Sequence, residues 1–171
     1  MRELLDQVLR AADARLYYLA LFGALAVPDV CASMESADGL TNASRYISWF
    51  DSHVAPAYTV GPDRQPSLTG EDAYGVRCSM LHQSRTRPHR GAYSRVVFVE
   101  PGHHGLVMHN NVMGDALNLD ISLFCRDVVT AASDWLVNAE RTRTYQANYP
   151  HFLQRYPEGI APYIVGVPVL S

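Results

Sequence analysis

The chain has 171 residues, of which 48% are hydrophobic and 18% charged, and its 14 basic and 17 acidic side chains give a formal net charge of -3. This length and composition are typical of one soluble domain with a continuous core. The sequence pI of about 6.1 excludes a uniformly basic nucleic-acid-binding protein, because such domains usually have a pI above about 9. Any surface that binds nucleic acid must therefore be local.

The basic and cysteine residues narrow the class of protein further. Every basic residue is arginine, which is the pattern that a GC-rich coding sequence produces. The three cysteines, Cys31, Cys78 and Cys125, are odd in number and widely spaced, so we expect reduced thiols and a cytoplasmic location. The longest apolar run, 16–27, has 12 residues, whereas roughly 20 are needed to span a bilayer. We therefore expect neither a membrane span nor secretion.

The N-terminal half of the chain has the periodicity and the end signals of helices. Apolar residues recur at helical spacing from Glu3 to Val27, and Pro28 then blocks the hydrogen bond that would continue the helix. A hydroxyl at Thr69, followed by two acids, marks another helix start. The helices predicted here cover residues 3–27, 28–36, 43–55 with a cap at Thr41 or Asn42, and 71–83.

The C-terminal half changes character twice. Residues 94–100 are rich in β-branched side chains and precede a Pro-Gly-His-His-Gly cluster, which predicts a small β-hairpin over about 94–109. A second long amphipathic helix is predicted from a cap at Asp120 or Ser122 to about Gln146. Prolines in the tail, about 149–171, exclude a helix there. The expected fold class is mainly α, as a single domain over 1–171 with an inserted hairpin and an irregular proline-rich tail.

Arg77 lies within the apolar stripe of the predicted helix over 71–83. A guanidinium in that position needs a carboxylate, a phosphate or a subunit interface, because an unpaired buried charge is costly. Asp29 and Glu35 are the candidate carboxylates within the bundle. His82 follows five residues later, on the opposite side of an ideal helix, and would reach Arg77 if the last turn frays or tightens.

A basic segment begins at Arg77 and ends at Arg95, with five arginines, two histidines and no acid. In an acidic chain, this segregation of charge indicates a local anion-binding face, and an aromatic side chain within it can stack on a base. A solvated basic loop has the same composition. The candidate RNA-binding residues are Arg85, Arg87, Arg90, Tyr93 and Arg95.

The run Arg77-Cys-Ser-Met-Leu-His82 resembles the signature of the HEPN superfamily, in which an Arg and a His are four to six residues apart near the end of a helix. The resemblance covers about residues 1–85 and 120–146. It implies a HEPN-like helical bundle in which the motif helix faces a two-fold homodimer cleft. One departure is Cys78, because many active members have a polar residue, often Asn, directly after the Arg.

The resemblance also implies an activity, since members are commonly metal-independent endoribonucleases of toxin–antitoxin, abortive-infection and other defence systems. It assigns catalysis to Arg77 and His82, with RNA as substrate, no cofactor, and an antitoxin or other protein as a possible partner. Imidazole titrates near neutral pH and suits a base or acid, and a permanently charged guanidinium suits the charge on phosphorus. Two alternatives stay open: a structural Arg77 with His82 as a helix cap, and a non-catalytic dimeric binding or scaffold protein.

A competing site is formed by the histidines of the predicted hairpin. His103, His104 and His109, with Asp115 nearby, offer side chains that could share a zinc ion in a hydrolase. Adjacent histidines point to opposite faces of a strand, however, and no glutamate base stands beside them. The chain has no phosphate loop, no nucleophile elbow and no dinucleotide-binding fingerprint.

Overall fold

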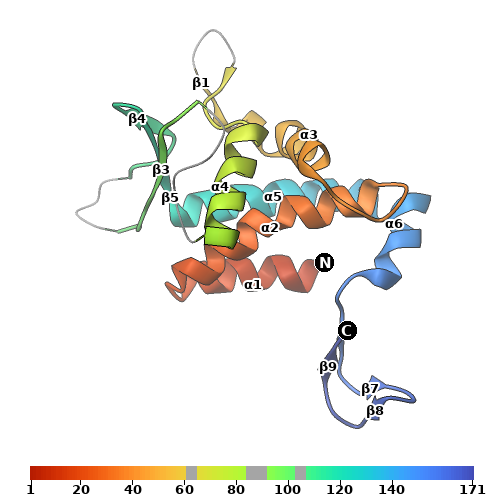
Figure 1. Ribbon diagram of the computed structural model, residues 1–171. Coiled ribbons are helices and arrows are strands. Elements are labelled where there is room, and N and C mark those ends of the chain that lie inside the picture. The colour runs from red at the N-terminus through yellow and green to blue at the C-terminus, as the bar shows by residue number, and fades with distance from the viewer. Residues whose placement is uncertain (61–64, 84–91, 103–106) are drawn as a thin grey trace.

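The computed structural model describes residues 1–60, 65–83, 92–102 and 107–171. Over these residues the chain is mainly helical, as the sequence predicts, with a three-stranded sheet at one end of the body and an extended C-terminal arm below it (Figure 1). The α-helices are α1 (Arg2–Asp13), α2 (Tyr17–Glu35), α3 (Ala43–His53), α4 (Gly70–Gln83), α5 (Ile121–Ala139) and α6 (Arg143–Asn148). Two short 3₁₀ helices, η1 (Ala55–Tyr58) and η2 (Tyr149–His151), follow α3 and α6.

The first predicted helix, over 3–27, is in fact two antiparallel helices, so this prediction is wrong. Arg15 adopts a left-handed backbone with φ 59°. The Leu16 N–H donates to the Ala11 carbonyl (2.8 Å) and the Arg15 N–H to the Ala12 carbonyl (3.0 Å). This pattern closes a helix C-terminus in a Schellman motif. The chain therefore reverses after α1 and packs α2 back against it.

Pro28 lies inside α2, whereas the sequence predicts that a second helix begins there. Proline leaves the carbonyl four residues earlier without its helical donor. The carbonyl of Leu25, which lies in the same turn of the helix, accepts a hydrogen bond from the buried hydroxyl of Tyr46 (3.1 Å). Continuing the helix buries both Val27 and Cys31, and this burial favours the unbroken helix.

One described helix, α2, has the length and mean hydropathy of a membrane-spanning helix. Half of its most apolar stretch is buried inside the protein, where α2 packs against α1, α3, α4 and α5. A core helix meets the same criteria of length and composition, so the helix assigns no location to the chain.

Side-chain caps begin three helices where the sequence predicts them. Asn42 accepts from the Arg45 N–H at the start of α3, and Asp120 accepts from the Leu123 N–H at the start of α5. At α4, Thr69 and Asp72 exchange hydrogen bonds in a reciprocal capping box. The predicted end of α5 near Gln146 is wrong, because the chain stops the helix after Ala139 and Thr142 caps the separate helix α6.

The predicted hairpin over 94–109 is also wrong. Strand β3 (Arg95–Val99) pairs in parallel with β5 (Ala116–Asp120), and β4 (Asn111–Met113) pairs with β5 in antiparallel. The hairpin is therefore β4–β5, and it turns at Gly114, whose φ of 64° favours glycine. The sheet packs on α5, where the rings of Phe98 and Phe124 meet edge to face with their centres 5.4 Å apart.

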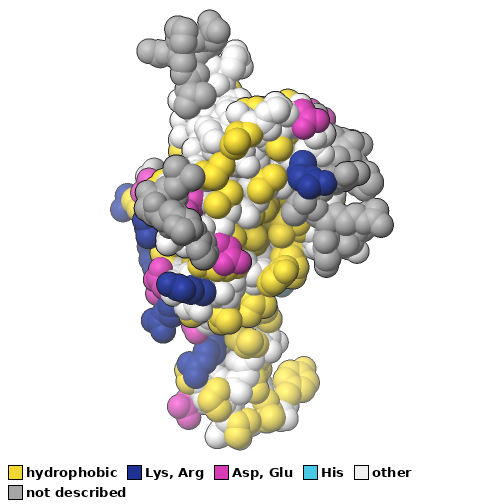
Figure 2. All heavy atoms as spheres, turned by 90° about the vertical axis from the view of Figure 1, so that its left-hand side faces the viewer, with side chains coloured by type: hydrophobic (Ala, Val, Ile, Leu, Met, Phe, Trp, Pro, Cys, Tyr) yellow, Lys and Arg dark blue, Asp and Glu magenta, His cyan; other side chains and the backbone are white. Residues whose placement is uncertain are grey.

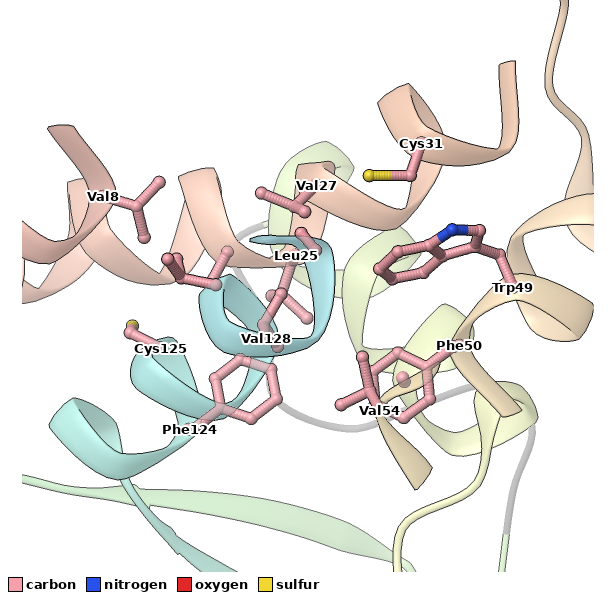
Figure 3. Packing of buried hydrophobic residues seen from close by; sticks show 14 of the residues in the cluster. Val8, Leu25, Val27, Cys31, Trp49, Phe50, Val54, Phe124, Cys125 and Val128 are labelled. Carbon is pink, nitrogen blue, oxygen red and sulfur yellow. The ribbon is translucent and has the colours of Figure 1, made fainter. Parts of the chain in front are cut away.

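One hydrophobic core joins α1, α2, α3 and α5 (Figure 3). Val8, Leu25, Phe50, Phe124 and Val128 point from these helices toward one another. The three cysteines are free, and Cys31 and Cys125 are buried in this core. Burial raises the pKa of the Cys31 thiol and raises that of Cys125 to about 12, so both behave as small apolar side chains.

A ladder of aromatic rings connects the core to the arm. Trp49 and Trp135 meet edge to face at 5.9 Å, and Trp135 meets Tyr145 at 6.0 Å. Tyr145 then stacks on Tyr149 at 5.4 Å, and Tyr149 on Phe152 at 6.0 Å. Contacts of this kind add about 0.5–1.5 kcal/mol each beyond burial. The ladder fixes the base of the arm on α5 and α6.

The arm itself is extended and stands away from the body (Figure 1). It contains two small antiparallel pairs, β6–β9 and β7–β8, in place of the irregular tail that the sequence suggests. Their bounds are β6 (Arg155–Tyr156), β7 (Gly159–Ile160), β8 (Ile164–Val165) and β9 (Val169–Leu170). A further pair, β1 (Thr59–Val60) with β2 (Gln65–Pro66), precedes α4.

The turn between α2 and α3 contains an exposed ion pair with a measurable titration. Arg45 donates to Asp38 at 2.6 Å, and this bond, with a second from the Leu40 N–H, lowers the pKa of Asp38 to about 2. A depressed carboxyl pKa stabilises the fold above the unfolded-state value near 3.9 and loses that contribution as the pH falls toward 2. We expect an NMR titration of the Asp38 carboxyl to have its midpoint near 2. In Arg45→Met the midpoint should rise toward 3.9, and an unchanged midpoint would contradict the assignment.

Candidate functional site

The candidate site is built on α4, which is anchored at its N-terminus by α3. The Gly70 N–H donates to the Asp51 carboxylate (2.6 Å). A Cβ at Gly70 would lie 2.4 Å from the Ile47 carbonyl oxygen, so only glycine permits this close approach of the two helices. From this anchor α4 crosses and contacts α2 (Figure 1).

Arg77 forms an ion pair with Asp29 of α2. The Arg77 Nε–Asp29 Oδ2 distance is 2.8 Å, and the two side chains are 21% and 15% exposed. The pairing with Asp29 was one of the two alternatives that the sequence left open. The other carboxylate, Glu35, instead accepts from the Trp135 indole N–H. Burial opposes the charge on Arg77, but Asp29 and the neighbouring Cys78 together outweigh it, so the pKa of the arginine is raised.

For Asp29, the carboxylate of the pair, burial has a larger effect on the pKa than the ion pair. Burial raises the pKa of Asp29 above its usual value, although the Arg77 guanidinium acts in the opposite direction. The 2.8 Å geometry nevertheless fits a charged pair at neutral pH. Through Nε alone, Asp29 fixes the guanidinium and leaves its two terminal nitrogens directed elsewhere.

One of those nitrogens contacts His82. The distance from Arg77 Nη1 to His82 Nε2 is 3.1 Å, and the His82 side chain is exposed. Helix α4 continues through Gln83, so the expected fraying of its last turn is not needed. The long arginine side chain spans the distance instead. Because arginine always carries its protons, Nη1 donates and His82 Nε2 accepts, which places the imidazole in the neutral form.

Two further α4 side chains surround the guanidinium. The Arg77 guanidinium carbon lies 6.0 Å from the centre of the Tyr74 ring, at the limit of a cation–π contact. Cys78 Sγ lies 4.0 Å from Nη1. Tyr74 is not among the residues predicted from the sequence, although its position three residues before Arg77 places the two on one helix face.

The basic segment is only partly described. Arg85, Arg87 and Arg90 lie outside the described residues, and Arg95 is exposed on β3. Tyr93 is half-buried, and its hydroxyl donates to the Ser67 carbonyl (2.7 Å), so part of its ring is used in packing. The Ala92 N–H donates to the buried Asp72 (2.7 Å). Asp72 thus holds the end of the basic segment against the start of α4.

The candidate zinc residues are not brought together where the structure describes them. His109 Nε2 lies 3.3 Å from Asp127 Oδ2, and that carboxylate also accepts from the Tyr58 hydroxyl (2.9 Å). His103 and His104 lie outside the described residues. Within the described ranges, no group of three or more His, Cys, Asp or Glu side chains is arranged to hold a metal ion. The Tyr58–Asp127 contact joins residues 69 apart, and no sequence motif signals it.

The described molecule also has a groove that lies away from the Arg77–His82 pair. This groove of about 1270 Å³ runs between the start of α1, α6 and the base of the arm, and no histidine lines it. Acid–base chemistry at neutral pH needs an imidazole or a perturbed carboxyl, so the Arg77–His82 pair is the stronger candidate for catalysis even though it lies on an open surface. Comparison with protein-family models, with curated proteins and with solved structures finds no match for this chain.

Proposed function

We propose that the chain is an endoribonuclease of HEPN type that cleaves RNA with Arg77 and His82. The observation that carries the proposal is the 3.1 Å contact between Arg77 Nη1 and His82 Nε2. It pairs a permanent cation with an exposed imidazole at the end of one helix. The sequence motif and the mainly helical fold support the same proposal.

The chemistry is transfer of the phosphodiester to the neighbouring 2′-hydroxyl. When the phosphate draws Arg77 Nη1 away from His82, the Nε2 lone pair is freed and takes the 2′-hydroxyl proton. The 2′-oxygen attacks phosphorus, and the bond from phosphorus to the 5′-oxygen breaks. The products are a 2′,3′-cyclic phosphate and a 5′-hydroxyl. Arg77 donates to the phosphoryl oxygens as their charge grows.

Protonation of the 5′-oxygen needs a second group. In the homodimer that the resemblance implies, His82 of a second copy is that acid. The same resemblance leads us to include a cytoplasmic location, a toxin–antitoxin or other defence setting, and an antitoxin or other protein partner in the proposal. These parts rest on the motif of Arg77 and His82 alone.

Asp29 is a positioning residue in this scheme. It binds Arg77 through Nε, so the guanidinium keeps one orientation while Nη1 points to His82. Among the described residues, Nη2 has no hydrogen-bond partner, which leaves it available to a phosphate. The hydrogen bond from the Ala92 N–H to Asp72 brings the end of the basic segment back to the start of the same helix.

The second candidate function is a non-catalytic binding or scaffold protein. It is favoured by the ion pair itself, because a guanidinium held by Asp29 at 2.8 Å already has a structural partner. Cys78 in place of the usual polar residue favours it too. This candidate predicts no RNA cleavage with or without divalent metal.

The test is cleavage of a structured RNA in buffer containing EDTA. We expect His82→Ala to lower the rate by about 10²–10⁴-fold, the usual contribution of a general base, with an unchanged melting temperature because the side chain is exposed. His151→Ala, another exposed histidine on η2, is the matched control and should cleave normally. A wild-type chain without activity, or full activity in His82→Ala, would remove the catalytic assignment.

A further inference from the structure

The C-terminal arm presents apolar side chains that its own chain does not cover. Leu153, Tyr163, Val165 and Leu170 are 62%, 87%, 71% and 68% exposed. Its strands form only two-stranded pairs, and such pairs are marginal in water without a covering surface. Residues 159–171 carry no charged side chain. This arm needs an apolar partner.

A second uncovered apolar surface lies on the body at the start of α2. Leu16, Tyr18 and Leu19 are 53%, 78% and 62% exposed, and the stretch 16–27 is also free of charged side chains. Figure 2 shows hydrophobic side chains gathered on one face of the body and continuing onto the arm. The same chain therefore exposes two apolar surfaces of matching character.

The groove at the base of the arm gives the two surfaces a place to meet. It is about 1270 Å³ in volume and is lined by apolar residues of the body and of the arm, including Leu4, Val30, Tyr149, Leu153 and Leu170. An ion pair between Arg2 and Glu140 (2.8 Å) lies on its wall. An apolar floor with polar groups beside it is the usual composition of a protein interface.

We propose that the start of α2 in a second copy of this chain occupies this groove, and that two copies clasp each other reciprocally with their arms. A two-fold contact of this kind covers the arm and the α2 surface of both copies at once. Nine large apolar side chains of the two surfaces are exposed, and at roughly 100 Å² each they give about 900 Å² per copy and about 1,800 Å² in the dimer. That area lies within the roughly 1,200–2,000 Å² of stable interfaces.

The chain offers a third exposed apolar group, which serves as the control surface. Val112 and Met113 on the edge strand β4 are 50% and 59% exposed, but Gly114 and Asp115 follow them directly and Asn110 and Asn111 precede them. This surface is smaller and more polar than the start of α2. The clasp uses a different contact from the motif-helix dimer that the resemblance implies, and the variants below separate the two contacts because their test measures mass and not cleavage.

The first test is sedimentation velocity of the full chain at micromolar concentration. We expect a dimer of twice the 19.0 kDa chain mass, and we expect Leu170→Asp and Leu19→Asp each to sediment as folded monomers. Val112→Asp should remain dimeric. A monomeric wild type would overturn the proposal. A dimer that persists in both aspartate variants, such as a dimer formed at the motif helix, would overturn it too.

The second test identifies the contact. A chain with Leu153→Cys is mixed with a differently tagged chain with Leu19→Cys, and we expect a mixed disulfide between them under mild oxidation. Pairing either variant with wild type gives the background from native cysteines such as Cys78. A mixed disulfide no more abundant than that background would place the arm elsewhere and overturn the assignment of the groove. Leu170→Ser, which adds no charge, repeats the mass measurement should Leu170→Asp fail to fold.

Discussion

Replacing Arg77 by alanine is expected to abolish RNA cleavage and to lower the free energy of unfolding by about 1–3 kcal/mol. The activity is lost because the cation that faces the phosphate is gone. The stability falls because Asp29 keeps a carboxylate that is only 15% exposed and no longer paired. The estimate lies below the figure for fully sealed pairs, since Arg77 itself is 21% exposed.

The double variant Arg77→Ala/Asp29→Asn separates the two roles. Removing the second charge should restore part of the stability, measured by urea unfolding, because no unpaired carboxylate remains. If Arg77 acts on the substrate, the double variant stays inactive despite its restored fold. Recovery of cleavage in parallel with stability would instead assign Arg77 a purely structural role. Arg143→Ala, at an exposed arginine on α6 outside the basic segment, controls for the loss of one positive charge.

Gly70→Ala is expected to lower the free energy of unfolding by about 3 kcal/mol, the upper part of the range for overpacking. The added Cβ would lie 2.4 Å from the Ile47 carbonyl oxygen and 2.9 Å from its Cα. These are backbone atoms, so α3 and α4 must move apart. The measurement is chemical unfolding, together with the cleavage rate, since α4 carries both Arg77 and His82.

Gly23→Ala provides the graded comparison. Its Cβ would lie 2.8 Å from Val8 Cγ2, which is a side-chain atom, so a small shift of Val8 relieves the contact without moving a backbone carbonyl. We expect a loss of stability well below that of Gly70→Ala and no change in cleavage, because Gly23 lies where α2 meets α1. Equal losses at the two positions would show that close contact with backbone atoms is not the cause.

Helix starts were predictable from the sequence where a side chain supplies the signal. Asn42, Thr69 and Asp120 each satisfy backbone N–H groups in the way that their residue types predict. Helix ends were harder. Arg15 adopts the left-handed conformation that glycine usually takes, and Pro28 is retained inside a helix because tertiary burial outweighs its local effect. Neither outcome depends on nearby residues alone.

The sheet was mispredicted because its decisive pairing is not local. Strand β3 pairs in parallel with β5, with Arg95 opposite Ala116, and the intervening β4 turns at Gly114. The β-branched run identified β3 correctly as a strand. The histidine-rich turn cluster beside it suggested the wrong partner, since a local turn signal cannot reveal a parallel pairing across intervening residues.

The contacts of the candidate site were likewise predicted only in part. Helical periodicity placed Arg77 on an apolar face and indicated that it needs an acid, and one of the two acids suggested, Asp29, is the partner found 48 residues away. The contact between Arg77 and His82 was predicted only for a frayed or tightened last turn of the helix. The length of the arginine side chain makes the contact possible in a helix that continues through Gln83. Tyr58, His109 and Asp127 lie far apart in the sequence, and no pattern joins them.

The aromatic ladder gives the protein an intrinsic fluorescence signal. The chain has two tryptophans, and both belong to that ladder, with Trp49 on α3 and Trp135 on α5. Intrinsic fluorescence therefore reports the docking of α3 on α5 without any attached label. It also senses Glu35, which accepts from the Trp135 indole, so a shift in emission would register a rearrangement at the end of α2 during assembly.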